Sequence, residues 1–398
     1  MPDHSLKSPR AVAAVILLFA YNGLVMGVYA SSIAIFRRRL GVDNTELTIL
    51  LALTGLAAVS SMQLVGRAVD RFGARRACLM MIVPLIIAAT GYALAPSYPL
   101  LLATGVFLGI GNGGIDVAMN ALAVQVENHR LAAGRRPLFS FFHGTWSIGM
   151  FAGSLAISLV GNVLKVPANT TLTICGLAAA GIGVFAVAVA WRVTPETELL
   201  PHTDDHGQKR RIPATAWLLG LMALAFGLGE GTATDWSTSQ VSAVAAVDDE
   251  AAAWAVTAMT ACMVIIRLTA DWLVARFGRV AMVRLGGAVA AVGYLLTAFS
   301  SAFPLLILGW ALVGLGIGVV APQVYAAAGN LAGGRGLAMV VTFGYSVFLL
   351  GPVVIGALVS WLGIHHAMAV PGALLVGLVA VAGVAMGGDK ASSSADYA

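Results

Sequence analysis

The sequence predicts an all-α, polytopic membrane protein with twelve transmembrane helices in two pseudo-symmetric six-helix bundles. Three observations predict this fold: a very apolar composition, twelve apolar runs of membrane-spanning length, and an internal repeat. Of the 398 residues, 59% are hydrophobic and only 10% are charged, and the mean hydropathy is +0.90. Such a composition excludes a soluble globular protein and argues against a nucleic-acid partner.

Each apolar run is close to the ~20 residues that a membrane-spanning helix needs. The runs lie at about 11–36, 45–66, 77–95, 99–126, 138–161, 169–191, 214–236, 251–272, 282–301, 304–330, 337–361 and 367–386. One longer hydrophilic connection separates the first six from the last six. We therefore expect an N-terminal bundle over 1–191, a cytoplasmic linker over 192–213, a C-terminal bundle over 214–386 and a cytoplasmic tail over 387–398.

The basic residues predict the orientation. With both termini cytoplasmic, eighteen of the 23 lysines and arginines lie in inner segments, and four lie in outer ones. This bias follows the positive-inside rule, so the +5 net charge mostly reflects topology in a cytoplasmic membrane. The triplet Arg37-Arg38-Arg39 runs against the rule, and lipid headgroups, nearby acids or anions at the mouth are its possible partners. Arg267 lies within a span, and we expect it to pair with Asp271, one helical turn further on.

The two halves of the chain repeat each other with one offset. Arg71-Phe72-Gly73 recurs as Arg276-Phe277-Gly278, and Pro99-Leu-Leu recurs as Pro304-Leu-Leu. The glycines at 109, 111 and 113 recur at 314, 316 and 318. All three pairs share the same separation in sequence, called here the repeat offset, which indicates two copies of one six-helix unit.

A polar stripe crosses the apolar run at 99–126. Asn112, Asp116 and Asn120 are spaced four apart, so on a helix they share one face. A carboxylate facing lipid costs ~2.5–3.5 kcal/mol on insertion scales, so this face must meet protein or water. The same run has glycines at 109, 111, 113 and 114. Because small residues let helices pack closely in membranes, these glycines predict that the side of the helix opposite the polar stripe packs tightly against its neighbours.

Asp116 is the first candidate for proton coupling. It lies about ten residues from the inner end of its span, or ~15 Å, close to mid-membrane. Desolvation there favours the protonated acid and can link proton binding to substrate binding. The alternative is an acid that only braces neighbouring helices.

Glu230 and His143 are the other proton-coupling candidates. Glu230 lies among Gly227, Gly229 and Gly231, a pattern found where helices break around a site, or else it joins packed helices. His143 could relay protons to Asp116, or it is a hydrogen-bonded structural histidine. We place Asp235 and Trp236 at the outer end of their span, with Trp236 in the interfacial aromatic belt.

The candidate substrate-binding residues are polar or aromatic residues of the first, fourth, fifth and tenth spans. They are Tyr21, Asn22, Asn112, Asn120, Trp146, Gln323 and Tyr325. Gln323 and Tyr325 either ligate substrate hydroxyls or satisfy one another. Ala321 replaces Asp116 at the repeat offset, so the two halves are asymmetric.

The stretch Gly66-Arg-Ala-Val-Asp70-Arg71-Phe-Gly73-Ala74-Arg75-Arg76 resembles the loop signature of the major facilitator superfamily, G-x-x-x-D-[RK]-x-G-[RK]-[RK]. Ala74 departs from it, and the second copy keeps Arg276 and Gly278 but has Ala275 in place of the aspartate. The resemblance implies an inner gate in which Asp70 braces the eleventh span, while Arg71 and Arg75 add ion pairs that open as the halves rock. The alternative is that these charges, with Arg76, only set the topology.

Within that superfamily, Ile115-Asp116-Val-Ala-Met-Asn120 is similar to the L-E-x-x-x-N of fucose–proton symporters. The stretches His143-Gly-Thr-Trp146-Ser147 and Glu230-Gly-Thr-Ala-Thr-Asp235 resemble bacterial members of that fucose permease-like branch. The first span, Ala11 to Phe36, lacks the second acid of those symporters.

These observations predict a secondary active transporter that moves a small polar, sugar-like solute by alternating access, with H⁺ as the driving ion. The alternatives are drug or metabolite efflux by proton antiport and a non-transporting membrane sensor. We expect no enzyme activity. The chain contains the residue types of a hydrolytic triad, but no stretch of it resembles a nucleophile elbow. We also expect no cofactor and no metal site, and a monomer in the lipid bilayer.

Overall fold

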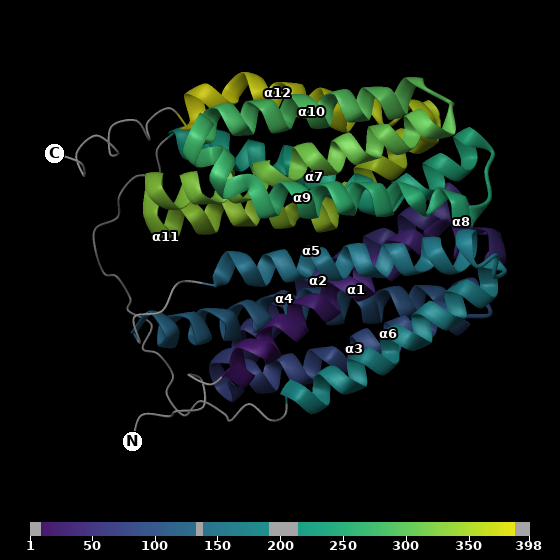
Figure 1. The fold of residues 1–398 in the computed structure, drawn as a ribbon, viewed down its shortest axis with the longest axis horizontal. Helices are drawn as coiled ribbons and strands as arrows, with labels where there is room; N and C mark the ends of the chain where they lie inside the picture. Colours follow the sequence, from purple (N-terminus) through teal and green to yellow (C-terminus); the bar gives the residue numbers. More distant parts are fainter. Residues whose placement is uncertain (1–8, 133–137, 191–213, 387–398) are drawn as a thin grey trace. The chain divides into compact units, whose positions relative to one another are not determined.

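The computed structural model describes residues 9–132, 138–190 and 214–386 (Figure 1). Helices and short turns make up these residues, and no strand occurs among them, which confirms the all-α prediction. The first half contains α1 (Pro9–Leu40), α2 (Asn44–Phe72), α3 (Ala74–Leu94), α4 (Tyr98–Ala132), α5 (Phe139–Ser158), the π-helical turn η1 (Leu159–Val163) and α6 (Ala168–Ala190). The second half contains α7 (Ala214–Ala245), α8 (Asp249–Ala252), α9 (Trp254–Phe277), α10 (Arg279–Phe299), α11 (Phe303–His366) and α12 (Ala369–Met386).

The helices are built to cross a membrane. Among the described residues, 11 helical segments are long and apolar enough to span a bilayer, and Leu350–His366 is a shorter apolar one. Many side chains on their outer faces are large and apolar, such as Leu64, Phe185, Leu268 and Trp361, the last 81% exposed. Apolar side chains in such numbers face lipid rather than water.

Two boundaries differ from the sequence prediction. The runs at 304–330 and 337–361 belong to one helical stretch, α11, because the segment between them is helical too. α7 continues to Ala245, beyond the expected end at 236. Trp236 therefore lies inside α7 and is 1% exposed, so its prediction as an interfacial belt residue was wrong.

The internal repeat extends to the ends of the helices. The repeat offset separates the start of α1 from the start of α7, and likewise their ends. The same offset separates α3 from α10 at both ends. Gly73, between α2 and α3, has φ 84° and ψ 152°, and Gly278, between α9 and α10, has φ 84° and ψ 153°. This positive φ favours glycine, which explains why both copies keep it.

The repeated glycines also meet equivalent neighbours. A side chain on Gly109 would collide with the carbonyl of Thr54, and one on Gly314 would collide with the carbonyl of Met259. Thr54 and Met259 are themselves related by the repeat offset. The helix crossing between α2 and α4 thus has its copy between α9 and α11, and glycine makes both close approaches possible.

Contacts divide the chain into two compact units. Of the described residues, the first unit contains 9–132 and 138–190 and also Asp248–Thr257, and the second contains 214–247 and 258–386. The short helix α8 and the first turn of α9 therefore pack with the first unit, although they follow α7 in sequence.

Candidate solute-binding site

Four glycines bring α1 and α5 together in the first unit. Side chains on Gly23 and Gly27 would collide with the carbonyls of Trp146 and Met150 on α5. In return, Gly149 and Gly153 face the carbonyls of Ala20 and Leu24 on α1, and the two helices share one of the most extensive contacts of the fold. Small residues four apart on both helices are the common means of close helix packing in membranes.

A chain of hydrogen bonds runs from α5 through α1 to α4. The indole Nε1 of Trp146 donates to Asn22 Oδ1 at 2.6 Å, and Asn22 Nδ2 donates to Asn112 Oδ1 at 2.9 Å. Asn22 is 1% exposed, while Trp146 and Asn112 are half-buried. The structure thus brings together three of the residues that the sequence singled out for substrate binding, and we call them the amide cluster.

The opposite side of α4 is closed by its neighbours. Gly109 and Gly113 face the backbone of α2, and Gly111 and Gly114 face Leu85 and Met81 of α3. This confirms the expected tight packing behind the polar stripe. The same packing turns Asn112 toward α1.

Asp116 and Asn120 continue the stripe along α4. Asn120 Nδ2 donates to the Asp116 backbone carbonyl at 2.7 Å and to Asp116 Oδ1 at 3.1 Å. Asp116 lies near the middle of the helix, which runs from Tyr98 to Ala132. The Asn120 Oδ1 atom is buried and accepts no hydrogen bond from the described residues. It is a free acceptor beside an acid.

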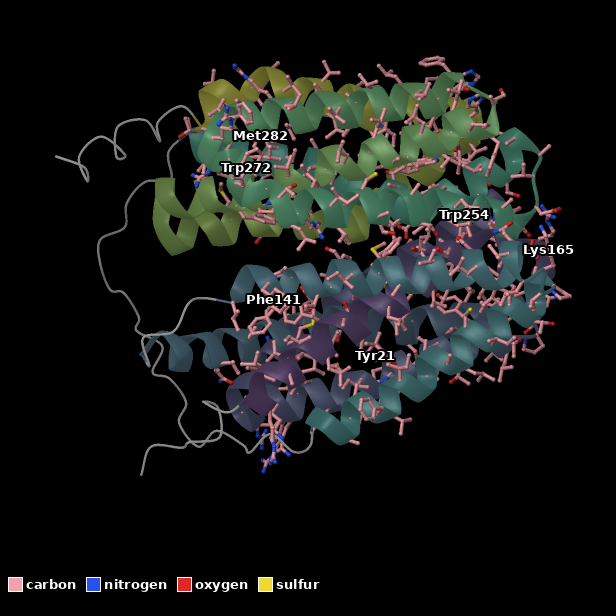
Figure 2. The ribbon with its side chains drawn as sticks, in the orientation of Figure 1. Tyr21, Phe141, Lys165, Trp254, Trp272 and Met282 are labelled. Atoms are coloured by element: carbon pink, nitrogen blue, oxygen red, sulfur yellow. The ribbon has the colours of Figure 1, made fainter. Side chains whose placement is uncertain are left out.

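Tyr21 and His143 contact residues outside the amide cluster. Tyr21, labelled in Figure 2, is 1% exposed; its hydroxyl faces Gly183 of α6 and has no hydrogen-bond partner among the described residues. The His143 ring is exposed and meets Phe19 edge-on, with centroids 5.1 Å apart. The roles given to both residues remain predictions.

In the second unit, Glu230 meets an arginine. Arg267 Nη2 of α9 lies 3.4 Å from Glu230 Oε1 of α7, with side chains 17% and 27% exposed. The sequence predicts that Arg267 pairs with Asp271, whose side chain lies outside the described ones. One feature of the sequence could have drawn attention to this pair: Arg267 is a basic residue inside an apolar span, and such residues usually mark a functional site.

Gln323 and Tyr325 each contact a protein side chain on another helix. Gln323 Oε1 accepts from Arg279 Nε at 3.2 Å, close to the turn between α9 and α10. The Tyr325 ring stands edge-on to Phe226, with centroids 5.6 Å apart. Their roles as substrate ligands stay predictions.

A fully buried polar network was not foreseen from sequence. Trp310 Nε1 donates to Gln240 Oε1 at 3.2 Å, and Gln240 Nε2 donates to the Thr297 carbonyl at 2.8 Å. The Tyr294 hydroxyl donates to the carbonyl of Gly229, next to Glu230. These bonds hold the second half of α7, from Gly229 to Gln240, against α10 and α11.

The residues of the loop signature lie around the turn between α2 and α3. Arg71 stacks over Phe72 at 5.2 Å, and Arg276 stacks over Phe277 at 5.7 Å in the second copy. Gly66, Arg75 and Arg76 are described and half-buried or exposed, whereas the Asp70 side chain is outside the described ones. The Asp70 brace is therefore still a prediction.

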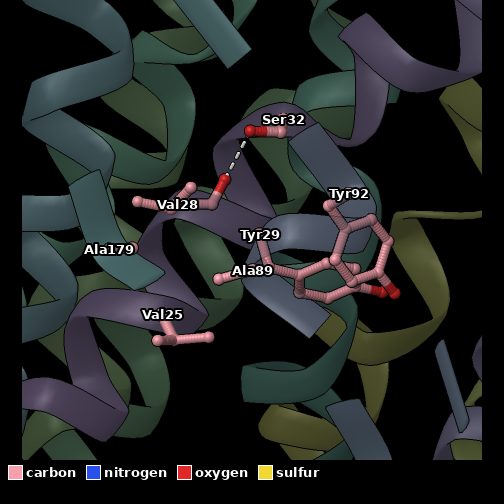
Figure 3. A pocket seen from close by; sticks show the side chains of 7 residues that line it. All are labelled: Val25, Val28, Tyr29, Ser32, Ala89, Tyr92 and Ala179. Carbon is pink, nitrogen blue, oxygen red and sulfur yellow. Dashed lines mark hydrogen bonds between the residues drawn. The ribbon is translucent and has the colours of Figure 1, made fainter. Parts of the chain in front are cut away.

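A small cavity lies elsewhere in the first unit (Figure 3). Its volume is about 10 Å³, and it is lined by Val25, Val28, Tyr29, Ser32, Ala89, Tyr92 and Ala179. Such a volume holds about one water molecule, so it is not a place for a sugar-sized solute.

The family follows from comparison with known proteins. The sequence model of the Major Facilitator Superfamily matches residues 15–239. The chain belongs to the major facilitator superfamily. Among curated relatives of this major facilitator, the uncharacterized transporter y4wD of Sinorhizobium fredii is 35% identical over 358 residues, covering 88% of this chain and 90% of that protein. The membrane protein MosC of Rhizobium meliloti is 28% identical, covering 90% and 86%.

Solved structures share the major facilitator fold. The nucleoside transporter NupG matches with a TM-score of 0.69 at 13% identity, covering 95% of this chain and 99% of that one. The E. coli fucose:proton symporter FucP matches with a TM-score of 0.61 at 15% identity, covering 94% and 98%. These likenesses confirm the predicted multi-pass transporter fold.

Proposed function

We propose that this transporter carries a small polar solute, a sugar or related polyol, together with protons across the cytoplasmic membrane. The amide cluster is the observation that carries the proposal. Its indole and amide groups are uncharged donors and acceptors, which suit hydroxyl groups rather than ions. The solved neighbours are named for nucleosides and for fucose, and both solutes carry several hydroxyl groups.

The stripe on α4 supplies the coupling site in this proposal. Asp116 lies mid-helix, one turn from Asn112 and one turn from Asn120. A solute hydroxyl at the amide cluster lies within reach of the same helix face, so protonation of Asp116 changes the bonds available to the solute. Glu230, which pairs with Arg267, is the second candidate for the proton in this proposal.

Alternating access completes the proposal. The bundles at 1–191 and 214–386, joined through 192–213, rock around the site, with Gly66, Asp70 and the neighbouring arginines at the inner gate and both termini cytoplasmic. Extrusion of a labelled solute, instead of its accumulation, would distinguish efflux from uptake.

The test uses purified protein. We expect hydroxylated solutes to raise its apparent melting temperature, because a ligand that binds the folded state stabilises it. In proteoliposomes, Asp116→Asn is expected to abolish accumulation driven by a pH gradient while solute exchange continues. The matched control is Asp43→Asn in the cap of α2, where asparagine also caps a helix and coupling should be retained.

Two results would contradict the proposal. Full pH-driven accumulation by Asp116→Asn would remove proton coupling at this residue. Stabilisation by organic cations or anions alone, with no response to sugars or polyols, would remove the solute class.

A further inference from the structure

One arginine of the second unit lies on an exposed apolar face of its helix. Arg284 belongs to α10 and is exposed, and the residue beside it, Leu285, is 58% exposed. The exposed face of α10 continues through Val292 and Leu295, which are both apolar. Because such a face on a membrane-spanning helix meets lipid, Arg284 is a basic side chain at the lipid boundary.

The guanidinium of Arg284 has a seat on the neighbouring helix. α10 and α12 pack side by side (Figure 1), and the Arg284 side chain reaches across to Gly383 of α12. A Cβ on Gly383 would collide with Arg284 Nη2 and would lie 3.1 Å from its Cζ. Only glycine therefore leaves room for the guanidinium at this place.

The hydrogen-bond donors of Arg284 are available to a ligand. Among the described residues, none accepts a hydrogen bond from its guanidinium or forms an ion pair with it. A guanidinium carries five N–H donors in a planar fork that matches the oxygens of a phosphate or carboxylate. The seat thus presents a full set of donors to an anion from outside the protein.

The first unit lacks this pair of residues. At the repeat offset, Leu79 stands in place of Arg284 and Ala178 in place of Gly383. The corresponding helices, α3 and α6, pack against each other all the same. The packing of this helix pair therefore needs no arginine, and another role is required for Arg284 and Gly383.

The seat lies at the depth of the lipid headgroups. Arg284 is five residues, or ~7.5 Å, beyond the first residue of α10, and helical side chains tilt toward the N-terminus, here toward the membrane surface. Gly383 is three residues, or ~4.5 Å, from the end of α12 at Met386. Trp272 and Phe277 are exposed near the end of α9 that leads into α10, and exposed aromatic residues mark the membrane interface.

We propose that Arg284 and Gly383 form a binding site for the phosphate of an anionic phospholipid, whose acyl chains lie along α10 and α12. Leu285 and Val384, the residues next to the seat, are apolar and exposed, so they suit acyl chains and not a hydrated free anion. With both termini cytoplasmic, the lipid belongs to the inner leaflet, where anionic lipids attract basic residues. Binding at this site is independent of which solute the protein carries.

The test measures lipid binding to purified protein in detergent. Phosphatidylglycerol is the anionic lipid, phosphatidylcholine is the zwitterionic one, and native mass spectrometry gives the affinity for the first bound lipid. We expect the wild-type protein to bind phosphatidylglycerol more tightly than phosphatidylcholine. Arg284→Gln should weaken phosphatidylglycerol binding roughly fivefold, the contribution of one basic residue near an anionic membrane surface.

Gly383→Ala tests the seat while every charge is kept. Its Cβ displaces the guanidinium, so we expect phosphatidylglycerol binding to weaken although alanine is the better helix former. Gly377→Ala is the matched control on the same helix, because its Cβ would meet nothing within 4 Å. Lys165→Gln is the control for charge, since it removes one exposed positive charge from the first unit, and both controls should bind like the wild-type protein.

Several results would overturn the site. Phosphatidylglycerol binding that is unchanged in Arg284→Gln or in Gly383→Ala would do so, and an equal loss in Lys165→Gln would show a diffuse attraction of anions instead. Equal occupation of the seat by inorganic phosphate would replace the lipid with a free anion. If Arg284 served only the C-terminal end of α12, whose dipole favours a positive charge, Arg284→Gln would lower the apparent melting temperature equally with and without phosphatidylglycerol.

Discussion

The ion pair between Glu230 and Arg267 lies near the middle of two membrane-spanning helices. Glu230 stands midway along α7, between Ala214 and Ala245, and Arg267 stands midway along α9. Lipid cannot solvate such charges, so the exposed part of this pair must meet water or other polar groups. The 3.4 Å separation is longer than that of a typical charge-assisted hydrogen bond.

Neutralising only one residue of this pair should reduce the stability of the protein more, per substitution, than neutralising both. We expect Glu230→Gln or Arg267→Gln alone to destabilise the protein by about 1–3 kcal/mol, because each removes the attraction between these two charges inside the membrane. The double variant should lose less than the sum of the single ones. The measurement is the apparent melting temperature in a double-mutant cycle. Strict additivity would show that the two side chains do not interact.

The contact between α1 and α5 sets the geometry of the amide cluster. Gly23 and Gly27 on one helix, and Gly149 and Gly153 on the other, let the backbones approach until Trp146 reaches Asn22. In each pair the two glycines are four residues apart, the spacing at which small residues form one face of a helix. The sequence could therefore have indicated that each helix packs closely against a neighbour. The motif does not name the partner helix, which only the packing of the whole unit decides.

Adding one methyl group at this crossing should separate the two helices. The Cβ of Gly149→Ala would overlap the Ala20 carbonyl, so we expect a loss of about 1–3 kcal/mol, as for other overpacked sites. Solute-induced stabilisation should weaken as Trp146 moves away from Asn22. Gly144→Ala is the control on the same helix, because its Cβ would meet nothing within 4 Å. A similar loss from both variants would show that the crossing geometry is not the cause, since alanine is otherwise the better helix former.

The architecture of the whole chain was more predictable than its site. Three sequence pairs at one offset already indicated the duplication, because close packing and tight turns need glycine at the same places in both copies. Polar partners across helices were less predictable. Arg267 contacts Glu230 on another helix, and the sequence did not indicate this pair, since the packing of the helices decides which side chains meet. Asp249 likewise reaches Arg38 only through folding.

The orientation of the transporter in the membrane is the last prediction. Eighteen basic residues on one side against four on the other predict that Lys165 is outside and Arg276 inside. Both side chains are exposed, and Figure 2 shows Lys165 at one end of its helices. A membrane-impermeant maleimide should label Lys165→Cys in intact cells, and label Arg276→Cys only after the membrane is permeabilised. The opposite pattern would place the Arg38–Asp249 pair at the cytoplasmic face, because only the charge distribution assigns it to the outside.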